Sequence, residues 1–212
     1  MHDDIKSQIK FGTDGWRGVI SDNFTFANVR IVAQATAEWI KNELKVPAPA
    51  GGHVAIGYDT RFMSGDFAEL VACVLAANGI TVYLSDTPIP TPALSYGVVQ
   101  IKGCCGIMIT ASHNPGKFNG IKIKTYQGGG ASKDITDRVE SHLGKTPVQD
   151  TTLAAAKSAG KIIIHDFKPV YLKFMRNYID LKKIKSAKFK VLTDVMHGSG
   201  QRQAGMRARH CR

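Results

Sequence analysis

Residues 104–115 of this chain read CCGIMITASHNP, and this segment indicates the fold class more directly than any other. Its first six residues are almost continuously apolar, which predicts a buried strand. The dipeptide Asn114-Pro115 then predicts a turn, because the backbone before a proline is restricted and the proline has no N–H for a sheet. Ser112 is therefore expected to present a hydroxyl group at the exit of a buried strand.

Predicted strands and helices alternate on both sides of this segment. Apolar residues recur at helical or alternating spacing between turn signals. They predict helices over residues 24–44, 66–78, 93–100, 132–143 and 167–181, and strands over residues 54–58, 80–84 and 120–126. This order predicts an α/β fold, a three-layer α/β/α sandwich around a mostly parallel sheet. Functional loops in such folds gather at the carboxyl ends of the strands, where Ser112 is expected.

The chain is predicted to contain one domain and the beginning of another. We expect residues 1–150 to form the first domain and residues 151–186 to form a helical connecting segment. Residues 187–212 are predicted to begin a second α/β domain, with a strand over residues 189–195. Residues 201–212 contain four arginines and few large apolar side chains, which does not suit a helix packed on that strand. We therefore expect the native coding of the second domain to be lost there, through truncation or a change of reading frame.

The charge is unevenly distributed along the chain. The first 156 residues carry 14 Lys and Arg against 14 Asp and Glu, whereas residues 157–212 carry 14 against 3, which accounts for the whole formal net charge of +11. The basic residues of the second part are mostly scattered lysines without an aromatic stacking platform. This pattern argues against nucleic acid as a partner.

The sequence also argues against a membrane location. The longest apolar stretch, residues 70–84, is interrupted by Asn78-Gly79 and is too short to span a bilayer. The charged first residues are not followed by an apolar run, so no signal peptide is expected.

Cys104 and Cys105 lack the spacing of a zinc or redox motif, and strand alternation places their side chains on opposite faces. We expect buried, reduced cysteines and a soluble protein of the cytoplasm.

The residue types around Ser112 favour phosphoryl transfer. A serine hydroxyl can hold a phosphoryl group covalently between two substrates, and a transferred phosphoryl group needs cations around its oxygens. Lys122 follows ten residues later in an alternating segment and supplies such a cation. A serine hydrolase is disfavoured, since His113 is adjacent to Ser112 and adjacent extended side chains diverge. The Gly-x-Ser-x-Gly motif of such hydrolases is also missing.

The ordered string over residues 110–115 resembles the phosphoserine loop of the α-D-phosphohexomutases, the phosphoglucomutase/phosphomannomutase family. Two further segments are similar to this family, FGTDGWRG at residues 11–18 and GYDTRFMS at residues 57–64. The resemblance covers roughly residues 9–200, and its specific motifs all lie in the first 130. In the second of these segments, Asp59 and Arg61 are predicted to have a structural role, by pairing with each other or with the loop of Arg17.

The resemblance implies roles for four residues. Ser112 would carry the phosphoryl group in the resting enzyme, donate it to a hexose phosphate, and recover it from a hexose 1,6-bisphosphate. Lys122 would act as a proton-transferring base or as a cationic clamp, because a base needs a lowered pKa whereas a nearby phosphate raises it. Arg17 would bind phosphate through its planar donor fork within a glycine-rich loop. His113 would donate to the phosphoryl or sugar oxygens.

The resemblance also implies Mg²⁺, with an oxygen of the phosphoryl group on Ser112 as one ligand. The family's acidic metal loop, Asp-Gly-Asp-Gly-Asp-Arg, its sugar-recognition loop and its C-terminal phosphate loop have no counterpart in this sequence. We therefore expect the family's activity, an isomerisation by phosphoryl transfer between the 1- and 6-positions of a hexose phosphate, to be negligible in this chain alone. The alternative is a non-enzymatic truncated product, or a module with weak anion or partner binding. Trp16 and the glycines at 128–130 favour a phosphoglucomutase over a phosphoglucosamine mutase.

Overall fold

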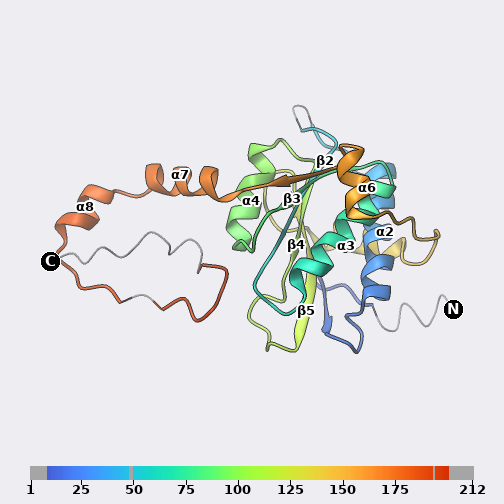
Figure 1. Ribbon diagram of the computed structural model, residues 1–212, viewed down its shortest axis with the longest axis horizontal. Helices are drawn as coiled ribbons and strands as arrows, with labels where there is room; N and C mark the ends of the chain where they lie inside the picture. The colour runs from blue at the N-terminus through green and yellow to red at the C-terminus, as the bar shows by residue number, and fades with distance from the viewer. Residues whose placement is uncertain (1–8, 48–49, 193, 201–212) are drawn as a thin grey trace.

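A computed structural model of the chain describes residues 9–47, 50–192 and 194–200 (Figure 1). Its centre is a six-stranded sheet with helices packed on both faces. This is the three-layer α/β/α arrangement that the sequence predicts.

The sheet is mixed and mostly parallel. In chain order its strands are β1 (Gly15–Val19), β2 (His53–Tyr58), β3 (Thr81–Ser85), β4 (Cys105–Ile109), β5 (Phe118–Thr125) and β6 (Ile162–His165). Their order across the sheet is β1-β5-β4-β2-β3-β6. β4, β2, β3 and β6 run parallel to one another, whereas β5 is antiparallel to both β4 and β1.

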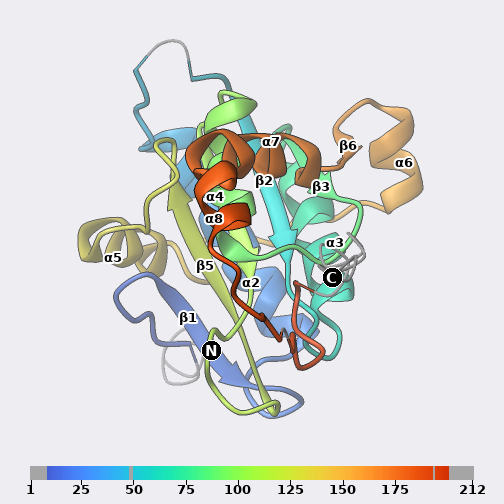
Figure 2. The ribbon, with the colours of Figure 1, turned by 90° about the vertical axis from the view of Figure 1, so that its left-hand side faces the viewer.

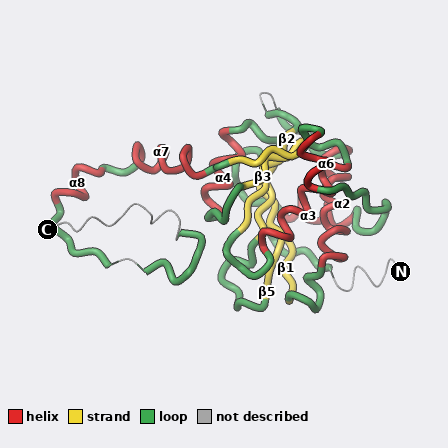
Figure 3. Tube along the Cα trace, viewed as in Figure 1, coloured by secondary structure: helices red, strands yellow, loops and turns green. Residues whose placement is uncertain are grey.

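The helices are divided between the two faces of the sheet. They are α2 (Phe26–Asn42), α3 (Ser64–Ala77), α4 (Thr91–Gln100), α5 (Lys133–Ser141), α6 (Leu153–Ser158), α7 (Lys168–Tyr178) and α8 (Leu181–Ser186). α2, α3, α5 and α6 lie on one face, and α4 with the residues that begin α7 lies on the other (Figure 1, Figure 3). Within the described ranges, no helix combines the length and the apolar character needed to cross a membrane.

Two apolar clusters join the helices to the sheet. The larger cluster lies between the sheet and α2, α3, α5 and α6, and it includes Trp16 and Ile107. The smaller cluster lies beneath α4, where Leu94, Met108 and Phe167 pack together. Successive strand residues point to opposite faces, so neighbouring Ile107 and Met108 belong to different clusters.

The same alternation places charged residues on one face of β5. Ile121 and Ile123 are buried in the larger cluster, so Lys122 and Lys124 lie on the face that carries α4. Lys122 is directly opposite Met108 of β4 in the strand register. Because α4 packs on β2 and β4, the two lysines lie beside this helix, over the neighbouring part of the sheet.

Two glycines allow β1 and β5 to lie close together. A Cβ atom at Gly15 would overlap the carbonyl oxygen of Ile121. One at Gly120 would lie 2.7 Å from the carbonyl oxygens of Thr110 and Trp16. Side-chain atoms do not approach backbone oxygens so closely, so only glycine fits these two positions in the paired strands.

The structure confirms most of the predicted helices and strands and adds two strands. β1 occupies a segment whose glycines predict a phosphate-binding or structural turn, and pairing with β5 along its whole length makes it a strand. β6 lies in the predicted connecting segment and pairs with β3. The predicted helix over residues 167–181 consists of α7 and the start of α8, with Asp180 capping α8. The division of the chain at residues 150 and 186 into domains stays a prediction.

The predicted strand over residues 189–195 is wrong for the residues described there. Residues 189–192 and 194–195 belong to no strand, and the side chains of Val191 and Leu192 are 82% and 97% exposed. A strand needs a neighbour for its N–H and C=O groups, and the described part of the chain offers none here. α7 and α8 extend away from the sheet in Figure 1, and they lie in front of it in the view of Figure 2. The two helices contain no buried residue. The arginine-rich residues 201–212 lie outside the described residues.

The adjacent cysteines are buried and unbridged, as predicted, but they do not point to opposite faces. The Sγ atoms of Cys104 and Cys105 lie 4.0 Å apart, and both residues belong to the larger cluster. Cys104 lies in a bend before β4 begins. The alternation that holds within a strand therefore does not apply to this pair.

Gly15→Ala tests the close approach of β1 and β5. We expect the added methyl group to push β1 away from Ile121 and to lower the free energy of unfolding by about 1–3 kcal/mol. Urea denaturation measures this difference. Gly52→Ala is the matched control, because no atom lies within 4 Å of the added Cβ there. Equal losses in the two variants would contradict the described pairing.

Candidate functional site

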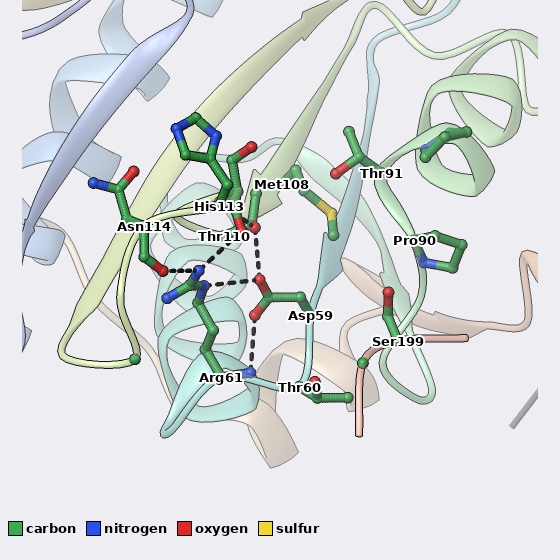
Figure 4. Close-up of a pocket in the computed structure, with 14 residues that line it drawn as sticks. Asp59, Thr60, Arg61, Pro90, Thr91, Met108, Thr110, His113, Asn114 and Ser199 are labelled. Carbon is green, nitrogen blue, oxygen red and sulfur yellow. Dashed lines mark hydrogen bonds and ion pairs between the residues drawn. The ribbon is translucent and has the colours of Figure 1, made fainter. Parts of the chain in front are cut away.

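A pocket of about 620 Å³ opens at the edge of the sheet where β2 and β4 end (Figure 4). Tyr58 of β2 pairs with Ile109 of β4, so the loops that follow these parallel strands begin side by side. We call residues 110–118, which follow β4, the serine loop. The loop after β2, the serine loop, the start of α4 and residues 198–199 line the pocket. Thr60 Oγ1 donates to the carbonyl oxygen of His197 at 3.0 Å, which holds this last segment at the rim.

Ser112 is exposed at the pocket in a left-handed backbone conformation, with φ of 58°. This conformation costs a non-glycine residue about 1–2 kcal/mol and persists where the surroundings fix the backbone. Two hydrogen bonds fix it here. The N–H of Ser112 donates to Thr110 Oγ1 at 3.0 Å, and its carbonyl oxygen accepts from Arg61 Nη2 at 2.9 Å.

Asp59 connects the end of β2 to the end of β4. Its Oδ2 accepts from Thr110 Oγ1 at 2.6 Å, and its backbone N–H donates to the carbonyl oxygen of Ile109 at 3.1 Å. Its Oδ1 accepts from Ser64 Oγ at 2.9 Å and from the backbone N–H of Arg61 at 3.0 Å. Both carboxylate oxygens are therefore occupied within the protein.

The Arg61 guanidinium group lies inside the curve of the serine loop. Nη2 donates to the carbonyl oxygens of Ser112 and Asn114 at 2.9 and 2.6 Å. Nη1 donates to those of Pro115 and Phe118 at 2.9 and 3.0 Å. These contacts satisfy four carbonyl groups of a loop that has no strand partner over most of its length.

A second group of charges lies on β1 and β5, beside the pocket. Lys122 Nζ forms an ion pair with Asp14 Oδ2 at 2.6 Å, and the exposed fraction of the Lys122 side chain is 13%. Arg17 Nη1 donates to the side-chain oxygen of Asn114 at 2.9 Å. This contact links β1 directly to the serine loop, one residue before Pro115.

The charges in this group perturb one another. Desolvation by burial raises the pKa of Asp14, but its hydrogen bond to Lys122 and the charges of Lys122, Arg17 and Lys124 outweigh this and hold the pKa below its usual value of 3.8. Desolvation lowers the pKa of Lys124, and the charge of Lys122 adds to this lowering, while Asp14 opposes it. The face of β1 and β5 that carries these side chains is therefore partly desolvated. It holds three cations, Arg17, Lys122 and Lys124, and the carboxylate of Asp14.

The structure brings some of the predicted site residues together and separates others. Ser112 and His113 both line the pocket. Arg17 reaches the serine loop through Asn114, whereas Lys122 is held by Asp14 and is not among the residues lining the pocket. The exposed His113 side chain points away from Asp59 and Arg61 (Figure 4).

Several residues around Ser112 were not predicted as part of the site. The sequence places Asp59 and Arg61 at a strand end, and the predicted pairing between them is confirmed by an ion pair at 3.3 Å. The partner of Arg61 is the serine loop and not the loop of Arg17. Neither Asn114 as a bridge nor Asp14 as the partner of Lys122 has a local sequence signal. Both contacts join residues about a hundred positions apart, and they depend on the pairing of β1 with β5.

The described residues contain no group of three or more His, Cys, Asp or Glu side chains able to hold a metal ion. Asp59 lines the pocket, but its carboxylate already accepts from three donors. These residues do not fit a Mg²⁺ site of their own, because Mg²⁺ needs an octahedral set of oxygens.

The family model for the phosphoglucomutase/phosphomannomutase alpha/beta/alpha domain I matches residues 8–149. The chain belongs to the phosphoglucomutase/phosphomannomutase family. The matched region contains β1 to β5, the serine loop and the charges on β1 and β5. The resemblance inferred from the motifs is thus confirmed.

Individual members of the phosphoglucomutase/phosphomannomutase family are similar over most of the chain. A phosphoglucomutase of Staphylococcus aureus (strain bovine RF122) is 31% identical over 94% of this chain and 36% of its own length. A Thermus thermophilus protein assigned as a phosphomannomutase superposes with a TM-score of 0.71 and 32% identity, over 84% of this chain and 38% of that one. The Paramecium phosphoprotein parafusin, a phosphoglucomutase, shares the fold, with a TM-score of 0.73 and 22% identity over 91% and 39% of the two chains. This chain thus spans a little over a third of the length of these relatives.

The ion pair between Lys122 and Asp14 makes a prediction about pH. Because the pKa of Asp14 is lowered in the folded state, its contribution to stability is present above pH 3.8 and is lost as the pH falls further through the folded-state pKa. We expect the free energy of unfolding of Asp14→Asn to decrease less steeply than that of the wild type as the pH falls below 3.8. Urea denaturation at a series of acidic pH values measures the two slopes.

Lys122→Met should also make the free energy of unfolding fall less steeply below pH 3.8, because it removes the cation that contributes most to the lowered pKa of Asp14. Asp137→Asn is the control, since it removes an exposed carboxylate that pairs with Lys133 within one helix. If the free energy of unfolding fell with pH as steeply in Asp14→Asn as in the wild type, the ion pair would not contribute to stability in solution.

Proposed function

We propose that this chain carries the phosphoserine module of a phosphohexomutase, and that Ser112 is the residue that accepts and donates the phosphoryl group. The observation that carries the proposal is the geometry of Ser112. Its hydroxyl-bearing side chain is exposed at a pocket, on a backbone held in a left-handed conformation by contacts with Arg61 in the loop after β2 and with Thr110 directly after β4.

The proposed reaction is a transfer in two directions. Ser112 Oγ attacks a phosphorus atom of a hexose 1,6-bisphosphate, the bond from phosphorus to the sugar oxygen breaks, and that oxygen takes up a proton while the serine loses one. The reverse reaction transfers the phosphoryl group to the other position of a hexose phosphate. Such a transfer depends on positioning and on cations around the phosphoryl oxygens. Mg²⁺, when bound to the phosphoryl group, would supply further positive charge.

The other candidate residues would act around Ser112. Arg17 offers a planar donor fork that suits phosphate, and its contact with Asn114 places it next to the serine loop. Lys122 is held in an ion pair by Asp14, which supports a role as a cationic clamp. His113 is exposed beside Ser112 and can donate to phosphoryl or sugar oxygens.

The sugar is proposed to be glucose, with mannose as the second candidate. The similar S. aureus protein is a phosphoglucomutase, whereas the similar T. thermophilus protein is assigned as a phosphomannomutase. Glucose phosphate and mannose phosphate differ at one hydroxyl group, and the described pocket shows no feature that distinguishes the two sugars. A cytoplasmic location is proposed with this metabolism, and neither nucleic acid nor a membrane is proposed as a partner.

Ser112→Ala tests the proposal directly. The test follows a single transfer to Ser112 and does not require the complete isomerisation, which is expected to be negligible in this chain alone. We expect the chain to gain the mass of one phosphate when it is incubated with glucose 1,6-bisphosphate and Mg²⁺, and the alanine variant to gain none. Removing one loop hydroxyl costs about 1 kcal/mol of stability, too little to unfold the domain. Intact-protein mass spectrometry measures the gain, and peptide mapping locates the modified residue.

Ser141→Ala is the matched control, because its hydroxyl group is exposed at the end of α5 and donates to the carbonyl oxygen of Arg138. A phosphate on a residue other than Ser112 would refute the proposed mechanism. Reversible binding of phosphate without covalent transfer would instead support the alternative, an anion-binding module.

Lys122 variants distinguish a cationic clamp from a base. We expect Lys122→Met to slow the phosphorylation of Ser112 by about 100-fold, because one cation near the developing charge is lost. Lys122→Arg keeps the positive charge and the ion pair with Asp14, and it should retain most of the rate. A Lys122→Arg rate as low as that of Lys122→Met would show that Lys122 transfers a proton, since arginine is not deprotonated in proteins.

A further inference from the structure

Arg61 lines the pocket, but its donors are all occupied within the protein. A guanidinium group has five N–H donors. Four of them have carbonyl acceptors in the serine loop, at distances of 2.6 to 3.0 Å. The fifth, on Nε, faces Asp59 Oδ2 in an ion pair at 3.3 Å.

An arginine in a phosphate pocket ordinarily suggests a phosphate ligand. Within the described structure, no N–H group of this guanidinium remains to face the pocket, and the charge of Arg61 is already balanced by Asp59. The exposed fractions of the two side chains are 14% and 16%, so water does not compete strongly for these contacts. Arg61 therefore differs from Arg17, which has one donor contact described, to the side chain of Asn114.

Asp59 fixes the orientation of Arg61 on the sheet. It follows the last residue of β2, accepts from the backbone N–H of Arg61, and forms an ion pair with Nε of the same residue. It also accepts from Thr110, which directly follows β4, and from Ser64 at the start of α3. The guanidinium plane is thus attached to three elements of the rigid core, while its outer edge holds a loop.

We infer that Arg61, oriented by Asp59, is a positioning residue that sets the place of the Ser112 hydroxyl group by holding the carbonyl groups of Ser112, Asn114, Pro115 and Phe118, and that it does not bind the substrate phosphate. This inference rests on the proposed role of Ser112. The left-handed conformation of Ser112 is the feature that needs such a device. Without Arg61 the loop carbonyls can turn to water, and the serine is expected to relax toward an ordinary backbone conformation.

The rate of phosphorylation of Ser112 tests this inference in the 212-residue chain, with glucose 1,6-bisphosphate and Mg²⁺ as the probe. We expect Arg61→Met to lower the maximal rate by about 100-fold, because a shift of the nucleophile by about 1 Å has such an effect. The half-saturating concentration of bisphosphate should stay the same. Arg61→Lys should recover little of the rate, since one ammonium group cannot reach four carbonyl groups and Asp59.

Hydrogen exchange provides a second readout that does not depend on transfer. Arg61→Met should accelerate exchange of the amides in residues 112–118, while the amides of β2 and β4 stay protected. Arg30→Met is the matched control, because Arg30 also pairs with an aspartate, Asp150, but lies outside the pocket. It should change neither the rate nor the exchange. If Arg61→Met does not fold, Arg61→Lys supplies both measurements.

The outcomes separate this inference from the proposed function. A raised half-saturating concentration with a recovered rate in Arg61→Lys would overturn the inference, because it would mean that Arg61 binds phosphate as a cation. If the wild type takes up no phosphate, the proposed function fails, and hydrogen exchange alone decides whether Arg61 holds the loop. Unchanged exchange in Arg61→Met would then overturn the inference as well.

Discussion

The register between β2 and β4 is the constraint on which the site depends. Tyr58 pairs with Ile109, so the residues that directly follow the two strands, Asp59 and Thr110, lie side by side. Thr110 Oγ1 therefore donates to Asp59 Oδ2 at 2.6 Å. A slip by one residue would move apolar side chains of either strand out of the cluster they occupy, so the core itself enforces this register. Packing of Ile107 and Met108 on opposite faces thereby determines where a hydroxyl group lies beyond the end of the strand.

The balance of charge follows from the same arrangement. Arg61 and Lys122 are each paired with a carboxylate, Asp59 and Asp14 respectively. Arg17 and Lys124 add positive charge to the same face without such an ion pair among the described contacts, so this face carries a surplus of positive charge close to the pocket. Its partial desolvation strengthens its attraction for an anion, because charges interact more strongly where water is excluded.

The fold and the site were predictable to different degrees. The central strands and the helices that cover them could be predicted from the spacing of apolar residues. Each helix buries one apolar face, and each central strand is buried on both faces. β1 was missed because its glycines, such as Gly15, look like a turn in sequence and are needed instead for the approach to β5. Ser112 and its loop could be located from sequence because the residues are contiguous. The contacts of Asp14 with Lys122, of Asn114 with Arg17 and of Asp59 with Thr110 could not, since contacts between distant segments arise only from strand pairing. The strand expected near Val191 illustrates the converse, because a β-prone sequence is not a strand without a neighbour.

The backbone conformation of Ser112 restricts which residue can occupy this position, and it does so independently of the hydroxyl group. A threonine has the same hydroxyl group and can also carry a phosphoryl group. Yet a β-branched residue with φ near 58° is a strained exception, because its second γ atom crowds the adjacent carbonyl groups. The left-handed turn thus selects the unbranched alcohol. In this loop the steric fit of the main chain decides between serine and threonine before reactivity is considered.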